Sequence, residues 1–177
     1  MFDIRKIQEQ AIFNAVKNES DENTAERIVN HPLENNQDWV ANTMKRLEES
    51  FDSPTVKSIR ISCQCGYEMD EKLALVKELM ANASNLEEFG SQKKAQAAGL
   101  SYRDGALFLM FPFCPCPMLA EVQKLPTKTW CQCTTGYSKV LFEKAFGCEV
   151  DVELLKSIKV GDDECLMKIV PLGTILF

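Results

Sequence analysis

Hydrophobic residues recur at helical spacing through the first half of the chain. Intervals of three or four residues place apolar side chains on one face of a helix. The clearest stripes consist of Val40, Met44, Leu47 and Phe51, and of Met69, Leu73, Val76 and Met80. A short segment ends at Gly90, and residues 91–104 have no strong period, so we expect a helix that frays into a loop there. Residues 1–104 are therefore predicted to be mainly helical.

The pattern changes after Gly105. Residues 106–111 form a short apolar run whose length and aromatic content predict a buried strand, with 118–122 as its hairpin partner. Polar and apolar residues alternate over 150–154 and 165–169, which predicts two further strands. A helix that begins at Thr134 or Thr135 and ends at Gly147 should lie between the strand pairs.

This order of elements predicts an α+β fold. We expect an N-terminal helical layer (1–104) packed on a C-terminal antiparallel sheet (105–177), with one helix between its strand pairs. The chain has 177 residues, the length of one domain, so residues 1–177 are expected to form a single domain.

Charge and composition exclude several functions. The net charge is −6 and basic residues form no block, so binding of nucleic acid is not expected. The uncharged run that contains 106–120 is shorter than the roughly 18 residues of a membrane span and includes three prolines. The N-terminus has no apolar signal-peptide core, which indicates a cytoplasmic protein. In that compartment a cysteine-rich pattern favours metal binding or catalysis over disulfides.

Six of the eight cysteines form three Cys-x-Cys pairs, whereas the chain contains one histidine. The pairs are Cys63 and Cys65, Cys114 and Cys116, and Cys131 and Cys133. The first and last pairs come just before predicted helices, whose N-terminal ends lower the pKa of a thiol. The thiolate is the form that ligates metals and attacks electrophiles.

An all-thiolate site suits zinc, an iron–sulfur cluster or Cu(I). We expect zinc, with the six paired cysteines as ligands or close neighbours of the ligands. The four ligands we favour are Cys114, Cys116, Cys131 and Cys133, because a hairpin would bring their loops together. The alternative is that the paired cysteines fill space in the core or form incidental disulfides, and that the protein holds no cofactor. Cys148 and Cys165 are expected to fill space in the core.

The C-terminal segment resembles the vinyl-reductase-type small-molecule-binding (hydrocarbon-binding) domains, and is also similar to the L-2-amino-thiazoline-4-carboxylate hydrolase-like proteins. The residues that carry the resemblance are Trp130-Cys131-x-Cys133-x-x-Gly136-Tyr137, Phe142-Glu143, Gly147, Val150, Val152, Ser157-Ile158 and Gly161-Asp162-x-x-Cys165-x-x-x-Ile169. The resemblance covers roughly residues 105–170 well and the helical half loosely. It implies helices on an antiparallel sheet, a small apolar or heterocyclic ligand and, in some members, a metal held by cysteines.

Three functional hypotheses follow. The first is a binding module that senses or holds a ligand beside a thiolate-bound metal, with ligand contacts from Phe111, Phe113, Trp130 and Tyr137. The second is a hydrolase of a cyclic C–N bond, in which Cys133 or Cys65 attacks or a metal hydroxide acts. The third is a redox switch, in which Cys-x-Cys pairs cycle between dithiol and disulfide. The apolar tail, residues 169–177, favours a homodimer.

Overall fold

The structure is a computed structural model that describes residues 2–177. The chain forms two compact units, each built from segments that are not contiguous in sequence. Unit 1 holds the chain up to Cys65, residues 114–136 and residues 159–161. Unit 2 holds residues 66–113, 137–158 and 162–177.

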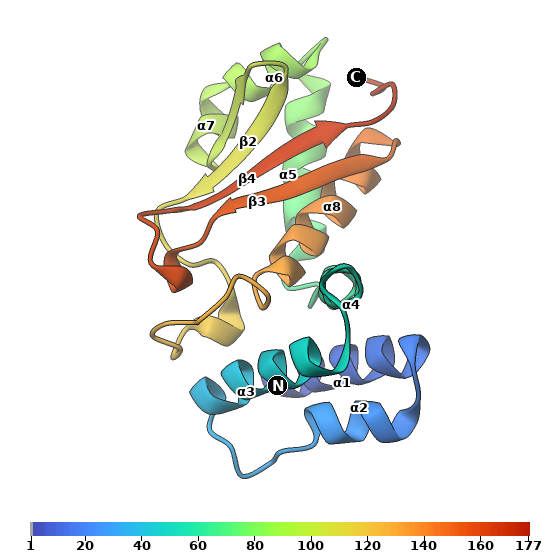
Figure 1. The fold of residues 1–177 in the computed structure, drawn as a ribbon. Coiled ribbons are helices and arrows are strands. Elements are labelled where there is room, and N and C mark those ends of the chain that lie inside the picture. The colour runs from blue at the N-terminus through green and yellow to red at the C-terminus, as the bar shows by residue number, and fades with distance from the viewer. Residues whose placement is uncertain (1) are drawn as a thin grey trace. The chain divides into compact units, whose positions relative to one another are not determined.

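Unit 1 is helical. Its elements are α1 (Ile4–Glu19), α2 (Glu22–Val29), α3 (Asn36–Ser50), α4 (Ser53–Ser62), the short 3₁₀ helix η1 (Pro117–Leu119) and the first turn of α8 (Gln132–Phe146) (Figure 1). Each of α1 to α4 begins at a side chain that accepts a hydrogen bond from the backbone N–H three residues later, which satisfies one of the unpaired donors of the first turn. These capping residues are Asp3, Asp21, Asn35 and Asp52.

The stripe predicted on α3 is confirmed, because Val40, Met44 and Leu47 are buried in unit 1. Trp39 is also fully buried, and its indole N–H donates to the carbonyl of Val29 at 3.0 Å. The 3₁₀ helix η2 (Ile158–Val160) contributes to this unit through Lys159, whose carbonyl accepts from the N–H of Leu125 at 2.7 Å. This bond anchors the loop that leads to Trp130.

Unit 2 contains the sheet. Its helices are α5 (Met69–Ala81), α6 (Leu86–Ser91), α7 (Lys93–Ala97) and the rest of α8, and its strands are β1 (Leu100–Arg103), β2 (Ala106–Phe111), β3 (Val150–Lys156) and β4 (Cys165–Pro171). The strand order is β1-β2-β4-β3, and every neighbouring pair is antiparallel. The fold class is therefore α+β, as predicted, with α8 between β2 and β3 in the chain.

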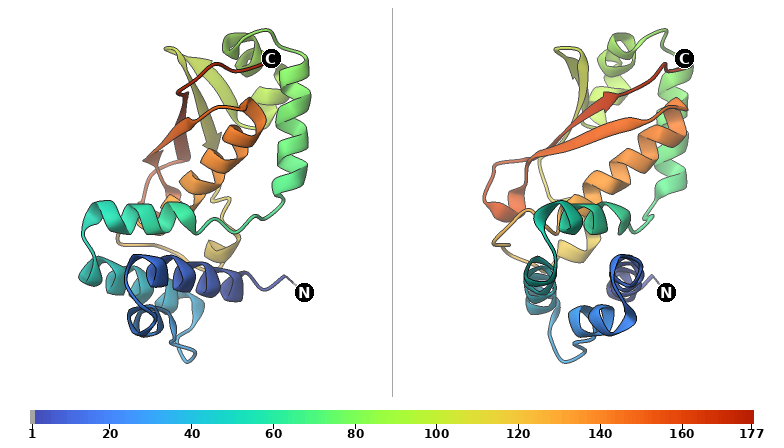
Figure 2. Two further views of the ribbon diagram at one scale, coloured as in Figure 1. Left: turned by 90° about the vertical axis from the view of Figure 1, so that its right-hand side faces the viewer. Right: turned by 45° about the vertical axis from the view of Figure 1, so that its right-hand side comes forward.

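Helices α5 and α8 lie on the same face of this sheet (Figure 2). The core that they form with the sheet is buried and apolar. Its side chains include Val76 and Leu79 of α5, Phe142 and Phe146 of α8, and Ile169 of β4. Burial of such side chains is worth roughly 1.5–3 kcal/mol each, so this face supplies most of the stability of unit 2.

Two predicted elements were wrong. Residues 118–122 do not pair with the strand at 106–111; Pro117 opens η1 there, and a proline has no N–H for a sheet. The partners of β2 are instead β1 and β4. Residues 91–104 do not fray into a loop, because Gly99, with φ +89°, ends α7 and turns the chain into β1.

No helix in the described part of the chain, residues 2–177, is long and apolar enough to cross a membrane.

Candidate thiolate site

All six paired cysteines belong to unit 1, whereas Cys148 and Cys165 belong to unit 2. The three pairs come from the end of α4, the segment before η1 and the start of α8. One compact unit thus contains the three segments that the sequence singled out. Cys165 lies buried on β4, as expected for a residue that fills the core.

Cys116 and Cys133 are in direct contact, although they come from different pairs. The Cys133 thiol donates a hydrogen bond to the Cys116 sulfur. Cys116 is the residue before η1, and the backbone N–H groups of Met118 and Leu119 point at its sulfur. These three donors, together with the indole N–H of Trp130, face one sulfur atom, which is the environment of a thiolate.

The pKa values of the two thiols are shifted in opposite directions. The hydrogen bond from Cys133 is the main reason that the pKa of Cys116 is lowered to about 6, against the opposing effect of burial. The same bond holds the proton on Cys133 and raises its pKa well above the ordinary range, and burial raises it further. The neighbouring Cys131 adds to this rise. The pair therefore carries one negative charge, centred on Cys116.

Arg60 supplies a positive charge beside this pair. Its side chain is 0% exposed, and its guanidinium carbon lies 4.3 Å from the centre of the Trp130 ring. One terminal nitrogen donates to the Trp130 carbonyl at 2.9 Å and the other to the Gln8 side-chain oxygen at 3.4 Å. The charge of Arg60 acts to lower the pKa of Cys133.

Within residues 2–177, no carboxylate forms a salt bridge with Arg60. A buried cation without an anionic partner is costly, because it has lost its hydration. Negative charge on Cys133 would offset that cost, because the charge of Arg60 acts on this thiol.

Cys63 makes its hydrogen bonds at the end of α4. It caps the C-terminal end of α4, where its thiol donates to the Ile59 carbonyl at 3.0 Å. Its carbonyl accepts from the Gln8 side chain at 3.1 Å, and burial raises the pKa of its thiol. Cys63 and Cys65 do precede a helix, α5, but the thiol of Cys63 bonds to the C-terminal end of α4, which offers carbonyls and no free N–H groups.

The start of α8 also differs from the prediction. The helix begins at Gln132, before Thr134, because the N–H of Gln132 already bonds to the Thr129 carbonyl at 3.3 Å. Cys131 therefore precedes the helix, and Cys133 lies inside its first turn. Both sulfur-bearing residues are buried.

Several buried polar atoms around the site have no hydrogen-bond partner. They are Arg60 Nε, Trp130 Nε1, Gln132 Oε1 and Thr135 Oγ1. The Trp130 indole N–H faces the Cys116 sulfur and lowers its pKa, although the contact lacks the usual geometry of a hydrogen bond. Such atoms are rare in protein interiors and concentrate where a ligand or reaction uses them.

No group of three or more His, Cys, Asp or Glu side chains within residues 2–177 is arranged to hold a metal ion. The expected zinc site at Cys63, Cys65, Cys114, Cys116, Cys131 and Cys133 stays a prediction. Of these residues, Cys65, Cys114 and Cys116 are partly exposed and the other three are buried.

The aromatic residues expected to contact a ligand divide between the units. Phe111, Phe113 and Tyr137 belong to unit 2, and Trp130 belongs to unit 1. The rings of Phe111 and Phe113 lie 5.9 Å apart, and Phe113 is 60% exposed. The Tyr137 hydroxyl donates to the Tyr67 carbonyl at 2.7 Å. Their role in ligand binding stays a prediction.

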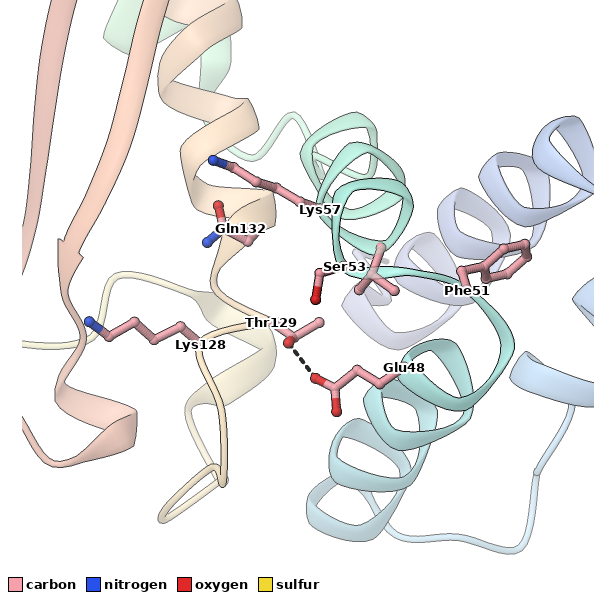
Figure 3. Close-up of a pocket in the computed structure, with 8 residues that line it drawn as sticks. Glu48, Phe51, Ser53, Lys57, Lys128, Thr129 and Gln132 are labelled. Carbon is pink, nitrogen blue, oxygen red and sulfur yellow. Dashed lines mark hydrogen bonds between the residues drawn. The ribbon is translucent and has the colours of Figure 1, made fainter.

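A pocket of about 410 Å³ lies in unit 1 beside the start of α8 (Figure 3). It is lined by Glu48, Phe51, Ser53, Val56, Lys57, Lys128, Thr129 and Gln132. The Glu48 carboxylate accepts from the hydroxyls of Thr127 and Thr129. Gln132, the residue between Cys131 and Cys133, forms part of the wall.

Sequence reasoning missed Arg60 and Gln8. The signal for Arg60 is its position on α4, four residues after Val56 and next to Ile59, both of which are buried. An arginine on an apolar helix face must find a partner in the interior. Gln8 gives the same signal on α1, where it shares the buried face with Ile12.

No curated protein and no solved structure matches the chain significantly. The resemblance to the vinyl-reductase-type and thiazoline-carboxylate hydrolase-like families stays a prediction. A family model matches residues 1–176, and the chain therefore belongs to the family of unknown function DUF6144.

Proposed function

We propose that the protein carries out thiol–disulfide exchange, with Cys116 as the attacking thiolate and Cys133 as the resolving thiol. The observation that carries this proposal is the direct hydrogen bond between the two thiols. Two thiols in contact are placed to form a disulfide after a small rotation of their side chains. Neither a histidine nor a carboxylate is needed to activate Cys116, because Cys133 already does so.

The exchange proceeds in two balanced steps. The Cys116 thiolate attacks one sulfur of a substrate disulfide, which forms a mixed disulfide and releases the other half as a thiolate. The Cys133 sulfur, as its proton leaves, attacks Cys116 and releases the second half as a thiol. The protein dithiol loses two electrons to the substrate disulfide, which becomes two thiols. An external thiol returns the protein to the dithiol.

Arg60 supports the same assignment. Attack requires an anion on sulfur in a largely buried site, and Arg60 provides a fixed positive charge there without a competing carboxylate. In the second step the negative charge moves to Cys133, whose acidity Arg60 increases. The guanidinium therefore favours the anionic form of Cys133 that the second step requires.

The test is oxidation of the reduced protein with a small disulfide, followed by mapping of the product by peptide mass spectrometry. We expect one intramolecular disulfide between Cys116 and Cys133, reversible with dithiothreitol. The Cys133→Ser variant should stop at the mixed disulfide on Cys116, whereas Cys116→Ser should form neither product. Cys148→Ser, in unit 2, is the matched control. Absence of a Cys116–Cys133 disulfide in the parent protein would reject the proposal.

A second candidate is a metal site, favoured by the proximity of Cys131 to Cys133. Cys116, Cys131 and Cys133 would then hold zinc, with a fourth ligand from the partly exposed Cys65 or Cys114. Elemental analysis of protein purified from zinc-replete cells decides between the two. One bound zinc, with thiols that become reactive only after chelation, would favour the metal site over disulfide exchange.

A further inference from the structure

Gln8 is a buried amide that joins α1 to the end of α4. Its side chain is 1% exposed, although glutamine is seldom found in protein interiors. The side-chain nitrogen donates to the Cys63 carbonyl at 3.1 Å, and the side-chain oxygen accepts from Arg60 at 3.4 Å. A carbonyl only accepts and a guanidinium only donates, so residue 8 has to supply one donor and one acceptor. A glutamine amide supplies both, whereas an ionised carboxylate has no donor.

The other end of Arg60 reaches the backbone that carries Cys133. Its second terminal nitrogen donates to the Trp130 carbonyl at 2.9 Å, and the N–H of Cys133 donates to the same oxygen at 3.3 Å. Gln8, Arg60, Trp130 and Cys133 all belong to unit 1. Hydrogen bonds at both ends therefore fix the guanidinium between α1 and the start of α8, where its charge acts to lower the pKa of Cys133.

The groups that hold Arg60 are neutral. The Gln8 amide and the Trp130 carbonyl accept its hydrogen bonds without cancelling its charge. The Cys63 thiol, which Arg60 also approaches, keeps its proton because burial raises its pKa. Charges in a protein interior are screened little by solvent, so a neighbouring charge acts strongly there. A carboxylate at residue 8 would pair with Arg60 and cancel much of this effect, and glutamate has nearly the same shape as glutamine.

We propose that Gln8 is a positioning residue for the exchange reaction, which holds the Arg60 guanidinium near Cys133 through a neutral oxygen and so keeps its positive charge available to the resolving step. The inference rests on the proposed thiol–disulfide exchange. In that step Cys133 releases its proton to water, and its anionic sulfur forms a bond to the Cys116 sulfur. The bond from Cys116 to the substrate half breaks, and that half leaves as a thiolate and takes up a proton. Arg60 favours the anion on Cys133, and residue 8 determines how strongly.

The test follows this step in reduced, metal-free protein treated with excess 2-hydroxyethyl disulfide, by acid quenching and mass spectrometry. Decay of the mixed disulfide on Cys116 gives the rate of resolution. Gln8→Glu should slow it at least fivefold, because a carboxylate beside Arg60 stays ionised and pairs with it. Gln8→Met loses the same donor to the Cys63 carbonyl without adding a charge, and should stay within twofold of the parent rate. Gln10→Glu makes the same substitution at an exposed position of α1 and should keep the parent rate.

The outcomes separate the two proposals. If the parent protein forms no Cys116–Cys133 disulfide, exchange itself is rejected and the inference falls with it. If the disulfide forms but Gln8→Glu resolves at the parent rate, exchange stands and the inference is overturned. Equal slowing in Gln8→Met would assign Gln8 a packing role only, and equal slowing in Gln10→Glu would indicate distant charge; either result overturns the inference. A Gln8→Glu protein that fails to fold where Gln8→Met folds would show that the carboxylate does not pair with Arg60, and would overturn it too.

Discussion

Gly136 in α8 lies so close to Ile61 near the end of α4 that a Cβ atom on residue 136 would sit 1.8 Å from the Ile61 carbonyl oxygen. Both residues belong to unit 1. Only glycine permits this approach of two backbones. The contact explains the glycine that follows Cys133 by three residues, and it holds the first turn of α8 against the turn of α4 that carries Arg60.

Gly136→Ala should therefore be strongly destabilising. The added methyl group meets a backbone carbonyl, which cannot move aside as a flexible side chain could. Overpacking of this kind costs typically 1–3 kcal/mol, and we expect a loss of about 3 kcal/mol in the free energy of unfolding. Urea denaturation followed by circular dichroism measures it.

The matched control is Gly147→Ala at the end of α8. Gly147 has φ +69°, but a Cβ there would meet no atom within 4 Å. The expected cost is about 1–2 kcal/mol from backbone conformation alone. Equal losses in the two variants would show that the approach to Ile61 does not constrain the fold.

The regular elements could be predicted because their periodicity reflects burial on one face. The stripe through Val40 and Leu47 and the strand at 106–111 are examples. Leu100–Arg103 was missed because four residues are too few to establish alternation. The grouping of the cysteines was visible in the sequence, but the contact between Cys116 and Cys133 was not. It joins two different pairs, and it depends on the path of the loop that follows η1.

Arg60→Met should make the Cys116–Cys133 disulfide harder to reduce. Removal of the buried charge destabilises the thiolate of the reduced state and leaves the neutral disulfide unaffected. Surroundings that stabilise the thiolate raise the reduction potential of the disulfide, so loss of that stabilisation lowers the potential. We expect a shift of about 30 mV to more negative values, which corresponds to a tenfold change in the equilibrium constant. Equilibration in glutathione redox buffers measures the shift.

Arg60→Lys separates charge from packing in this experiment. Lysine keeps the positive charge but loses the planar stacking over Trp130 and the two hydrogen bonds. The potential should stay near that of the parent protein while the stability falls. A potential that drops equally in both variants would assign Arg60 a packing role only.

Alkylation of Cys116 should depend on pH with a midpoint near 6. The thiolate is the reactive form, and the pKa of Cys116 is lowered to about 6. In metal-free protein the rate with iodoacetamide should rise from pH 5 and level off above about pH 7, whereas an ordinary thiol with a pKa of about 8.5 still gains reactivity there. Cys133→Ala removes the main donor and should move the midpoint upward. A midpoint that does not respond to this variant would refute the assigned hydrogen bond.

Trp130→Phe should have a clear effect on the pKa of Cys116 and a smaller one on the free energy of unfolding. The indole N–H of Trp130 faces the Cys116 sulfur and makes no other hydrogen bond, so its removal raises the pKa of Cys116 and shifts the alkylation midpoint upward. Phenylalanine keeps a ring under Arg60 and against Trp39, whose ring centre lies 5.7 Å away.

Trp39→Phe is the matched control, because Trp39 is equally buried but directs its N–H to the Val29 carbonyl. That variant leaves a buried carbonyl without its donor, which costs about 1–3 kcal/mol, and it should leave the midpoint of Cys116 in place. The two variants should therefore differ in both measurements. Trp39→Phe should lower the free energy of unfolding and leave the alkylation midpoint in place, whereas Trp130→Phe should mainly move the midpoint. If Trp39→Phe moved the midpoint as far as Trp130→Phe, the effect would come from loosened packing of unit 1, and the N–H of Trp130 would have no direct influence on the thiolate.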